Sequence, residues 1–336
     1  RVVKVALIVF SLFFLGQLSA DTDKVYTGIT DTQKMETSPA PTIEVPSRPE
    51  IKVETDKKVR VEKFVISGNK NVSTDELLNA ISKYKGKDLS IQQLMEIADI
   101  ITRKYWEKGY ITSFAYIPVQ KMERGILEIE VVEGRPGNII VKNNKYYTEK
   151  FIIGYFNKVS KKEILNNKDI ERALLLLNEF PKLSVNATLT KGSSPATTDI
   201  ILNVSEKMYP MNFGLFYNNF GSRYTGEHRV GFNWDWANIT KNGDVLSLTG
   251  VTNIEDFDQM WYWKAGYSIP IGYDGLKVGA DYSKMSYKIG KELKILGIEG
   301  EAEVFGIDVS YPLIRARDKN LSVSGGIRHK TYENFL

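Results

Sequence analysis

The stretch AYIPVQKMERGILEIEVVEGR, from Ala115 to Arg135, decides how the folded part of this chain begins. In its second half, Leu127, Ile129 and Val131 alternate with residues of the opposite face, two of which are glutamates. A period of two predicts a strand with one buried and one solvated face. Together with the apolar run that ends at Pro118, this strand predicts a hairpin that closes a small domain.

A strand and two helices are predicted ahead of this hairpin. The strand is RVEKFVISGN (60–69). Each helix opens with a serine, Ser73 or Ser90, that is followed three residues later by Glu or Gln, which is the pattern of a capping box. The second helix keeps its apolar residues on one face and ends at Gly109. The predicted order is strand, helix, helix, strand, strand.

The same order of elements repeats further along the chain. NIIVKNN (138–144) matches the first strand, and a later helix repeats the apolar spacing of the helix before Gly109. The strands LSVNATLT and TDIILNVSE then close the second copy. Residues 58–135 and 136–207 are therefore predicted to be two copies of one α+β module.

Beyond Pro210 the helical patterns stop and strict alternation begins. One face of each segment is apolar and aromatic, and the other is small, polar or charged. This pattern is typical of a transmembrane β-barrel with lipid outside and water inside. A soluble antiparallel sandwich, with its apolar face in a protein core, is the alternative. The seven segments are 211–218, 229–236, 246–249, 261–269, 276–283, 305–313 and 321–328.

Two features favour the transmembrane barrel over the soluble sandwich. Trp234, Trp236, Trp261 and Trp263 lie near strand ends, as in an interfacial girdle. The links also alternate in length, and the short ones are expected on the periplasmic side, where the two modules would lie. The short links are 241–244, 271–275 and 315–320, and the longer ones are 218–228, 252–259 and 288–302.

Charged and amide side chains of the polar face are expected to line the lumen. They would keep a water-filled path open, or they would form a static network that stiffens the wall. The predicted lumen-lining residues are Arg229, Asn233, Asp235, Lys277, Asp281, Asp308 and Arg328.

The N-terminal region predicts export. Residues 1–20 carry Arg1 and Lys4 before a short apolar run, as in a secretory signal peptide. A membrane anchor is the alternative, but the run is too short to span a bilayer comfortably. Residues 21–57 are polar and proline-rich, which predicts a disordered linker. The barrel, predicted over 208–336, needs more strands to close, so its C-terminal part is expected to be missing. The first residue is Arg, so the start of the chain is expected to be incomplete as well.

The composition of the chain excludes or disfavours several classes of function. The chain has 336 residues and a net charge of +4 from 45 basic and 41 acidic side chains, a balance that gives no reason to expect nucleic acid. It has no cysteine and two histidines, which excludes thiolate chemistry and disfavours a histidine-based active site. Glu128 and Glu130 are interpreted as the solvent face of a strand. No enzyme activity, metal, nucleotide or other cofactor is expected.

The hairpin resembles the first POTRA domain of two-partner secretion transporters, also called haemolysin secretion/activation proteins. The resemblance implies tandem POTRA domains in the periplasm and a barrel in the outer membrane of a Gram-negative bacterium. It also implies the translocation of one large secreted exoprotein in unfolded form, with outer-membrane lipid as the other partner. The residues that carry the motif are Pro118, Gln120, Gly125, Leu127, Ile129, Val131, Glu133 and Gly134.

An extended client could add to an exposed sheet edge by backbone hydrogen bonds. The candidate edges are the strands 111–117 and 183–190. Alternatively, both edges are simply solvated or are covered by the neighbouring module. The predicted client-binding residues are Ile111, Ser113, Ala115, Ile117, Leu183, Val185, Ala187 and Leu189.

Two other functions remain open at this stage. One is a factor of the same superfamily that inserts other barrels into the outer membrane, which the hairpin motif disfavours. The other is a surface-binding barrel without transport, which the paired modules disfavour.

Overall fold

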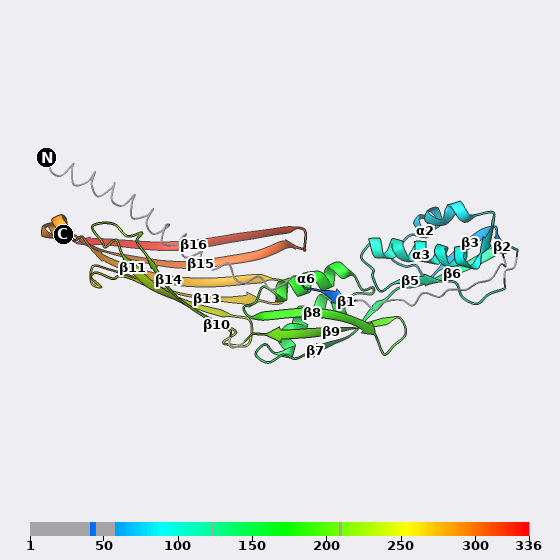
Figure 1. Ribbon diagram of the computed structural model, residues 1–336, viewed down its shortest axis with the longest axis horizontal. Coiled ribbons are helices and arrows are strands. Elements are labelled where there is room, and N and C mark those ends of the chain that lie inside the picture. Colours follow the sequence, from blue (N-terminus) through cyan, green and yellow to red (C-terminus); the bar gives the residue numbers. More distant parts are fainter. Residues whose placement is uncertain (1–40, 45–57, 122–123, 208–209, 336) are drawn as a thin grey trace. The chain divides into compact units, whose positions relative to one another are not determined.

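The structure is a computed structural model that describes residues 41–44, 58–121, 124–207 and 210–335 (Figure 1). The predicted signal peptide lies outside the described residues, as does most of the predicted linker. Within the described ranges, no helix has the length and apolar character needed to cross a membrane.

The first module is a three-stranded sheet with two helices. β6 lies in the centre, parallel to β3 and antiparallel to β5, while β2 and β4 form a separate ribbon. Ser90 and Gln93 form the complete capping box that was predicted for the long helix. The elements are β2 (Lys58–Val61), β3 (Lys63–Ser67), α2 (Thr74–Ile81), η1 (Ser82–Tyr84), β4 (Lys87–Ser90), α3 (Ile91–Glu107), β5 (Phe114–Tyr116) and β6 (Ile126–Val132).

The second module repeats this topology. β9 lies in the centre, parallel to β7 and antiparallel to β8. One difference is that β1 (Ile43–Glu44) adds to β8 as a parallel strand, so part of the segment predicted to be a disordered linker is a strand. The other elements are β7 (Arg135–Lys142), α4 (Glu149–Gly154), α5 (Asn157–Ser160), α6 (Asn167–Leu177), β8 (Leu183–Lys191) and β9 (Thr197–Glu206).

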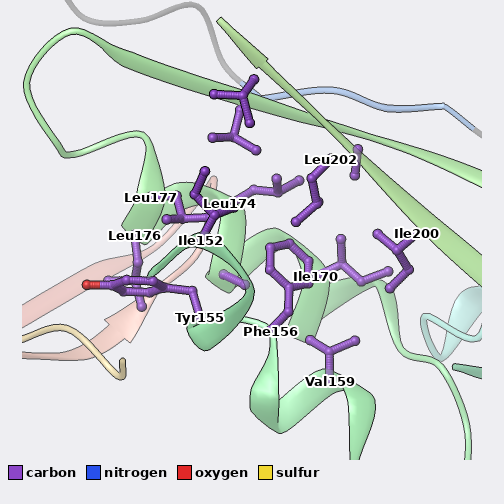
Figure 2. Packing of buried hydrophobic residues seen from close by; sticks show 14 of the residues in the cluster. Ile152, Tyr155, Phe156, Val159, Ile170, Leu174, Leu176, Leu177, Ile200 and Leu202 are labelled. Atoms are coloured by element: carbon purple, nitrogen blue, oxygen red, sulfur yellow. The ribbon is translucent and has the colours of Figure 1, made fainter. Parts of the chain in front are cut away.

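The core of the second module lies between its helices and one face of its sheet (Figure 2). Ile152 of α4 and Phe156, in the turn between α4 and α5, meet Ile170 and Leu174 of α6, all of them fully buried. Ile200 and Leu202 of β9 complete the contact. Burying one such side chain is worth about 1.5–3 kcal/mol, so this face holds the module together.

The repeat extends to individual hydrogen bonds. At the end of β6, Glu133 accepts bonds from the backbone N–H groups of Lys70 and Asn71, at 2.9 and 2.8 Å. At the end of β9, the Glu206 carboxylate accepts bonds from three backbone N–H groups, those of residues 145–147. Each carboxylate thus fastens the loop between the first strand and the first helix of its own module.

Glu133 also accepts hydrogen bonds from two side chains of the first module, those of Asn71 and Tyr105. The Tyr105 hydroxyl donates to it at 2.8 Å. Burial, followed by the hydrogen bond to Glu133, raises the pKa of Tyr105 above its ordinary value. The phenol therefore stays protonated and remains a donor.

The C-terminal part is a seven-stranded antiparallel sheet whose strands pair in sequence order. Its strands follow the order of the seven predicted segments, but several are longer than predicted: β15 extends over 17 residues and β16 over 16. The elements are β10 (Met211–Asn218), β11 (Arg229–Ala237), β12 (Val245–Asn253), β13 (Met260–Ile271), β14 (Leu276–Lys288), η2 (Lys291–Leu296), β15 (Glu299–Arg315) and β16 (Asn320–Phe335).

The apolar face of this sheet is exposed. Phe213, Leu215 and Ile327 are 67%, 73% and 80% exposed, and Phe305 and Val309 lie on the same side. In a soluble sandwich this face would be buried against a second sheet. Its exposure over several strands fits a lipid-facing surface, so the structure supports the barrel rather than the sandwich.

Candidate functional site

The outer edge of β5 is closed, contrary to the expectation from the sequence. The Ser113 carbonyl accepts a hydrogen bond from Trp106 Nε1 at 3.1 Å, and the Ala115 N–H donates to Thr102 Oγ1 at 2.9 Å. Both partners belong to α3. Ile111 and Ile117 are half-buried against the apolar clusters. Because these outward backbone groups already have partners, an added strand would have to displace the helix side chains.

The Pro-x-Gln motif has a structural explanation. The β5–β6 register pairs Tyr116 with Glu130, so Pro118 would come opposite Glu128. Proline has no N–H to donate at that place. The Gln120 side chain substitutes for the missing strand: its Oε1 accepts from the Glu128 N–H and its Nε2 donates to the Glu128 carbonyl, both at 2.8 Å. The motif therefore ends the hairpin without leaving β6 unsatisfied.

The other motif residues shape the same module. Leu127 is 1% exposed and belongs to the core. Gly125 has φ of 72°, and its carbonyl accepts the N–H groups of Glu62 and Lys63. A Cβ on Gly134 would lie 2.2 Å from Thr112 Oγ1, so only glycine fits there. These positions specify the fold of the module.

The first half of the β8 edge is also closed. The side-chain amide of Asn178 accepts from the Val185 N–H at 3.1 Å and donates to the Val185 carbonyl at 2.9 Å. Asn178 is the residue at the C-terminal cap of α6. The side chains of Leu183, Val185, Ala187 and Leu189 all point into the core and are at most 1% exposed. A segment that pairs with the edge of β8 would therefore contact the backbone of this strand and not these four side chains.

The second half of the β8 edge carries β1. Ile43 lies opposite Ala187 and Glu44 opposite Thr188, and the Ala187 N–H donates to the Thr42 carbonyl at 3.1 Å. β8 was predicted to be an open edge strand, and this prediction is wrong over Ala187–Thr188. The edge nevertheless accepts an extended segment from a distant part of the chain.

The seven residues predicted to line the lumen share one face of the C-terminal sheet. The register connects them through direct partners, for example from Asp235 through Ser247, Gly266 and Asp281 to the strand of Arg328. This is the face opposite the exposed apolar residues. A hollow on it is lined by residues that include Lys264, Lys277, Asp281 and Asp308.

Several of these charges are paired. The Arg328 guanidinium donates to Asp281 Oδ1 at 2.7 Å and to Asp308 Oδ2 at 2.8 Å. Lys264 Nζ lies 3.5 Å from Asp281 Oδ2, and Asn233 accepts a bond from Thr249. Arg229, the first residue of β11, is 4% exposed. The ion pairs and hydrogen bonds among these side chains fit the alternative in which they form a static network that stiffens the barrel wall.

Each short link of the sheet contacts the second module. Asn238 Nδ2 donates to the Tyr146 carbonyl at 2.9 Å, and the Arg317 N–H donates to Glu171 at 2.7 Å. In the link between β13 and β14, Asp274 lies 2.7 Å from Lys158. The short links therefore lie at the end of the sheet that contacts the second module, as predicted from their short length.

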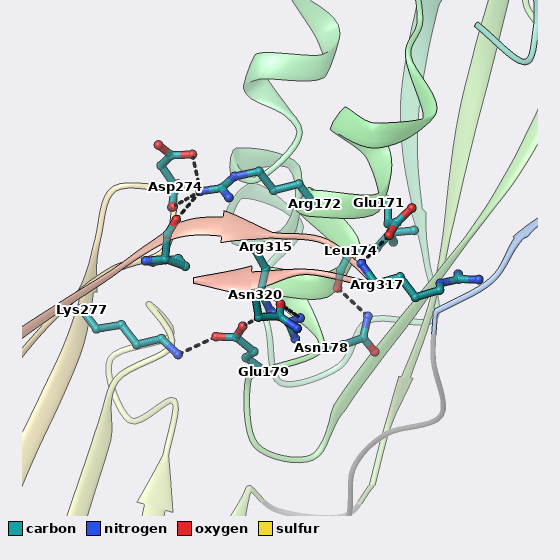
Figure 3. A network of polar contacts seen from close by, with 11 residues as sticks. Glu171, Arg172, Leu174, Asn178, Glu179, Asp274, Lys277, Arg315, Arg317 and Asn320 are labelled. Atoms are coloured by element: carbon teal, nitrogen blue, oxygen red, sulfur yellow. Dashed lines mark hydrogen bonds and ion pairs between the residues drawn. The ribbon is translucent and has the colours of Figure 1, made fainter. Parts of the chain in front are cut away.

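Figure 3 shows the network at this junction, in which α6 and the residues that follow it meet the links. Glu179 accepts from Arg315 Nε at 2.6 Å and from Lys277 Nζ at 3.0 Å. Lys277, predicted to line the lumen, thus also holds the second module. Arg172 donates to the Pro312 carbonyl at 2.9 Å.

Asp274 is the most connected carboxylate of the junction. Its partial burial acts to raise its pKa, but the hydrogen bonds from Lys158 and Tyr311 and the charges of Lys158 and Arg172 outweigh this effect. The pKa of Asp274 therefore lies below its ordinary value. The carboxylate stays ionised and keeps its contacts with α5 and α6.

Comparison with known proteins identifies these parts. Residues 59–134 match the model of the POTRA domain, ShlB-type, and residues 196–336 match that of the Haemolysin secretion/activation protein ShlB/FhaC/HecB. The chain is 24% identical over 263 residues to the heme/hemopexin transporter protein HuxB of Haemophilus influenzae, covering 78% of this chain and 46% of HuxB. It is 25% identical over 259 residues to the outer membrane transporter CdiB of Dickeya dadantii, covering 75% and 45%.

The solved structure of CdiB from Escherichia coli has the same fold. It matches with a TM-score of 0.71 and 22% identity over 95% of this chain and 60% of that one. CdiB from Acinetobacter baumannii matches with a TM-score of 0.59 and 19% identity, over 95% and 62%. The chain spans about half the length of the curated relatives it matches.

The fold and the matches define an outer-membrane β-barrel protein whose POTRA domains lie in the periplasm. Within that class, the two family matches and the transporters HuxB and CdiB confirm the resemblance to haemolysin secretion/activation proteins that the hairpin carries. The matched families are transporters rather than enzymes.

Sequence reasoning missed the residues that close the edges and those that join the second module to the sheet. Asn178, Trp106 and Thr102 lie 7 to 13 residues before the strand residues that they bond, and no periodic pattern marks them as partners of those residues. A signal for β1 was available. Thr42-Ile43-Glu44 brings β-branched residues together inside an otherwise polar linker, which is a strand composition.

Proposed function

We propose that this chain is part of a transporter that carries one large secreted exoprotein, in unfolded form, through its barrel and across the outer membrane. The POTRA modules bind extended segments of the exoprotein in the periplasm, and lipid surrounds the apolar face of the barrel. HuxB and CdiB are both named as transporters, and transport is the property that their names share.

The observation that carries the proposal is the β1–β8 pair. The second module holds an extended segment by backbone hydrogen bonds, with the strand side chains of β8 buried beneath it. Backbone pairing does not demand one sequence, so it suits a client that arrives unfolded. The module is joined to the short links of the sheet, which brings a bound segment to the periplasmic end of the polar face.

Deletion of the gene in its native bacterium tests the proposal. We expect one large protein to disappear from the culture medium, as measured by quantitative mass spectrometry, while the wild-type gene on a plasmid restores it. The other outer-membrane barrels should stay at their normal level. An unchanged medium would contradict the proposal, and a general loss of other barrels would identify an assembly factor instead.

A further inference from the structure

We infer that the outer edge of β8 over Ala187–Lys191 is a strand-addition site that the chain's own residues 41–44 and the exoprotein occupy in turn. We call this edge, together with the Asn186 and Thr188 side chains, the β8 addition site. The inference rests on the proposed function and adds a regulated step to it: the client binds the second module only after the chain's own segment has left.

The contacts of the resident segment describe what the site recognises. Asn186 Oδ1 accepts from the Thr42 N–H at 2.9 Å and from the Thr42 hydroxyl at 3.3 Å. Ile43 packs against the core of the module, and Thr188 Oγ1 donates to Glu44 at 3.3 Å. The site therefore fits an extended segment with a hydroxyl residue, then an aliphatic residue, then a hydrogen-bond acceptor.

The resident segment is suited to leave. Its sequence is PTIE, it begins with Pro41, and the next proline of the sequence is Pro46. Proline has no N–H to donate, so the segment offers a short stretch for pairing. Each backbone hydrogen bond adds only a modest net stabilisation. A client segment without prolines could pair as far as Lys191 and replace it.

The barrel side of the junction holds the resident segment as well. Arg317, in the link between β15 and β16, donates from Nη2 to the Pro41 carbonyl at 2.7 Å, while its N–H donates to Glu171 of α6. One residue thus joins the sheet, α6 and the resident segment; Figure 3 shows Arg317 and Glu171 at this junction. Departure of the segment removes the bond from Arg317 to Pro41. The contacts of the link between β15 and β16 therefore depend on whether the resident segment occupies the β8 addition site.

A disulfide lock tests the inference in the full-length protein. Glu44 and Thr188 are direct partners, and the 336 residues contain no cysteine, so Glu44→Cys with Thr188→Cys in a background free of other cysteines creates a single disulfide. In the native bacterium, the oxidised double variant is expected to release at least about tenfold less exoprotein than either single-cysteine variant, because a tethered competitor acts at high effective concentration. A reducing agent should restore release.

The outcomes separate the inference from the proposed function. If the locked variant, checked by its mobility on a non-reducing gel, releases as much exoprotein as the single variants, the inference is overturned and transport stands. If even the wild-type protein releases none, the proposed function fails.

A binding measurement tests the same site without transport. The probe is a fluorescent peptide with the sequence of residues 40–50, APTIEVPSRPE. We expect it to bind at least about tenfold more tightly to the purified protein carrying Thr42→Gly, Ile43→Gly and Glu44→Gly than to the wild type, whose site is filled. A peptide with Ile43→Asp should lose this binding. Equal binding to both proteins, or binding to neither, would overturn the inference.

Discussion

Val309→Arg is expected to reduce the stability of the folded barrel in the membrane by about 2–4 kcal/mol, the cost of an arginine on the lipid face near the bilayer centre. Val309 lies on the exposed apolar face of β15, opposite Val278 and Gly325. Urea unfolding in lipid vesicles measures the change, and the amount of heat-modifiable folded protein in the outer membrane should fall with it.

The control is the adjacent residue. Ser310 lies on the polar face, opposite Lys277 and Ser324, and also lines the hollow. Ser310→Arg should leave the stability within about 1 kcal/mol of the wild type, because its charge stays in water. If Ser310→Arg is the damaging change and Val309→Arg is tolerated, the two faces have been assigned the wrong way round.

Glu133→Ala is expected to destabilise the first module by about 2–4 kcal/mol, since it leaves several donors without their charged acceptor. The lost partners are the N–H groups of Lys70 and Asn71, the Asn71 side chain and the Tyr105 hydroxyl. Amide hydrogen exchange in the full protein should show faster opening of β3 and β6 while the second module keeps its protection.

Glu128→Ala is the matched control on the same strand. The Glu128 side chain is exposed, and its backbone keeps its bonds to Gln120. We expect Glu128→Ala to change the stability of the first module, measured by exchange, by no more than an ordinary surface substitution does, about 0.5 kcal/mol. Equal effects of the two alanines would show that the Glu133 carboxylate does not fasten the loop.

Much of the fold follows from local patterns. Alternation assigned the two faces of the C-terminal sheet because side chains of a strand point to opposite sides in turn. It predicts that Asp281 and Arg328 share one face, and the two side chains are in contact there. The repeat was visible because Ile170 and Leu174 recur at the spacing of Ile97 and Ile101.

The state of the sheet edges did not follow from the sequence. Whether an edge is open depends on which side chain of another element satisfies its backbone, as Asn178 at the end of α6 does for Val185. Thr42 and Asn186 are 144 residues apart, so their contact leaves no periodic signal. The same holds for Glu179, whose two cationic partners, Lys277 and Arg315, lie at the ends of β14 and β15.

Cross-linking of the exoprotein during its passage tests the central claim most directly. A photoreactive residue at Thr249, on the polar face of β12, is compared with one at Leu248, its neighbour on the apolar face. The client is the protein that the deletion removes from the medium, arrested by a folded domain fused to its C-terminus. The account predicts that the client cross-links to position 249 and not to position 248. Cross-links from position 248 alone, or from neither position while the client is arrested, would contradict passage along the polar face of this barrel.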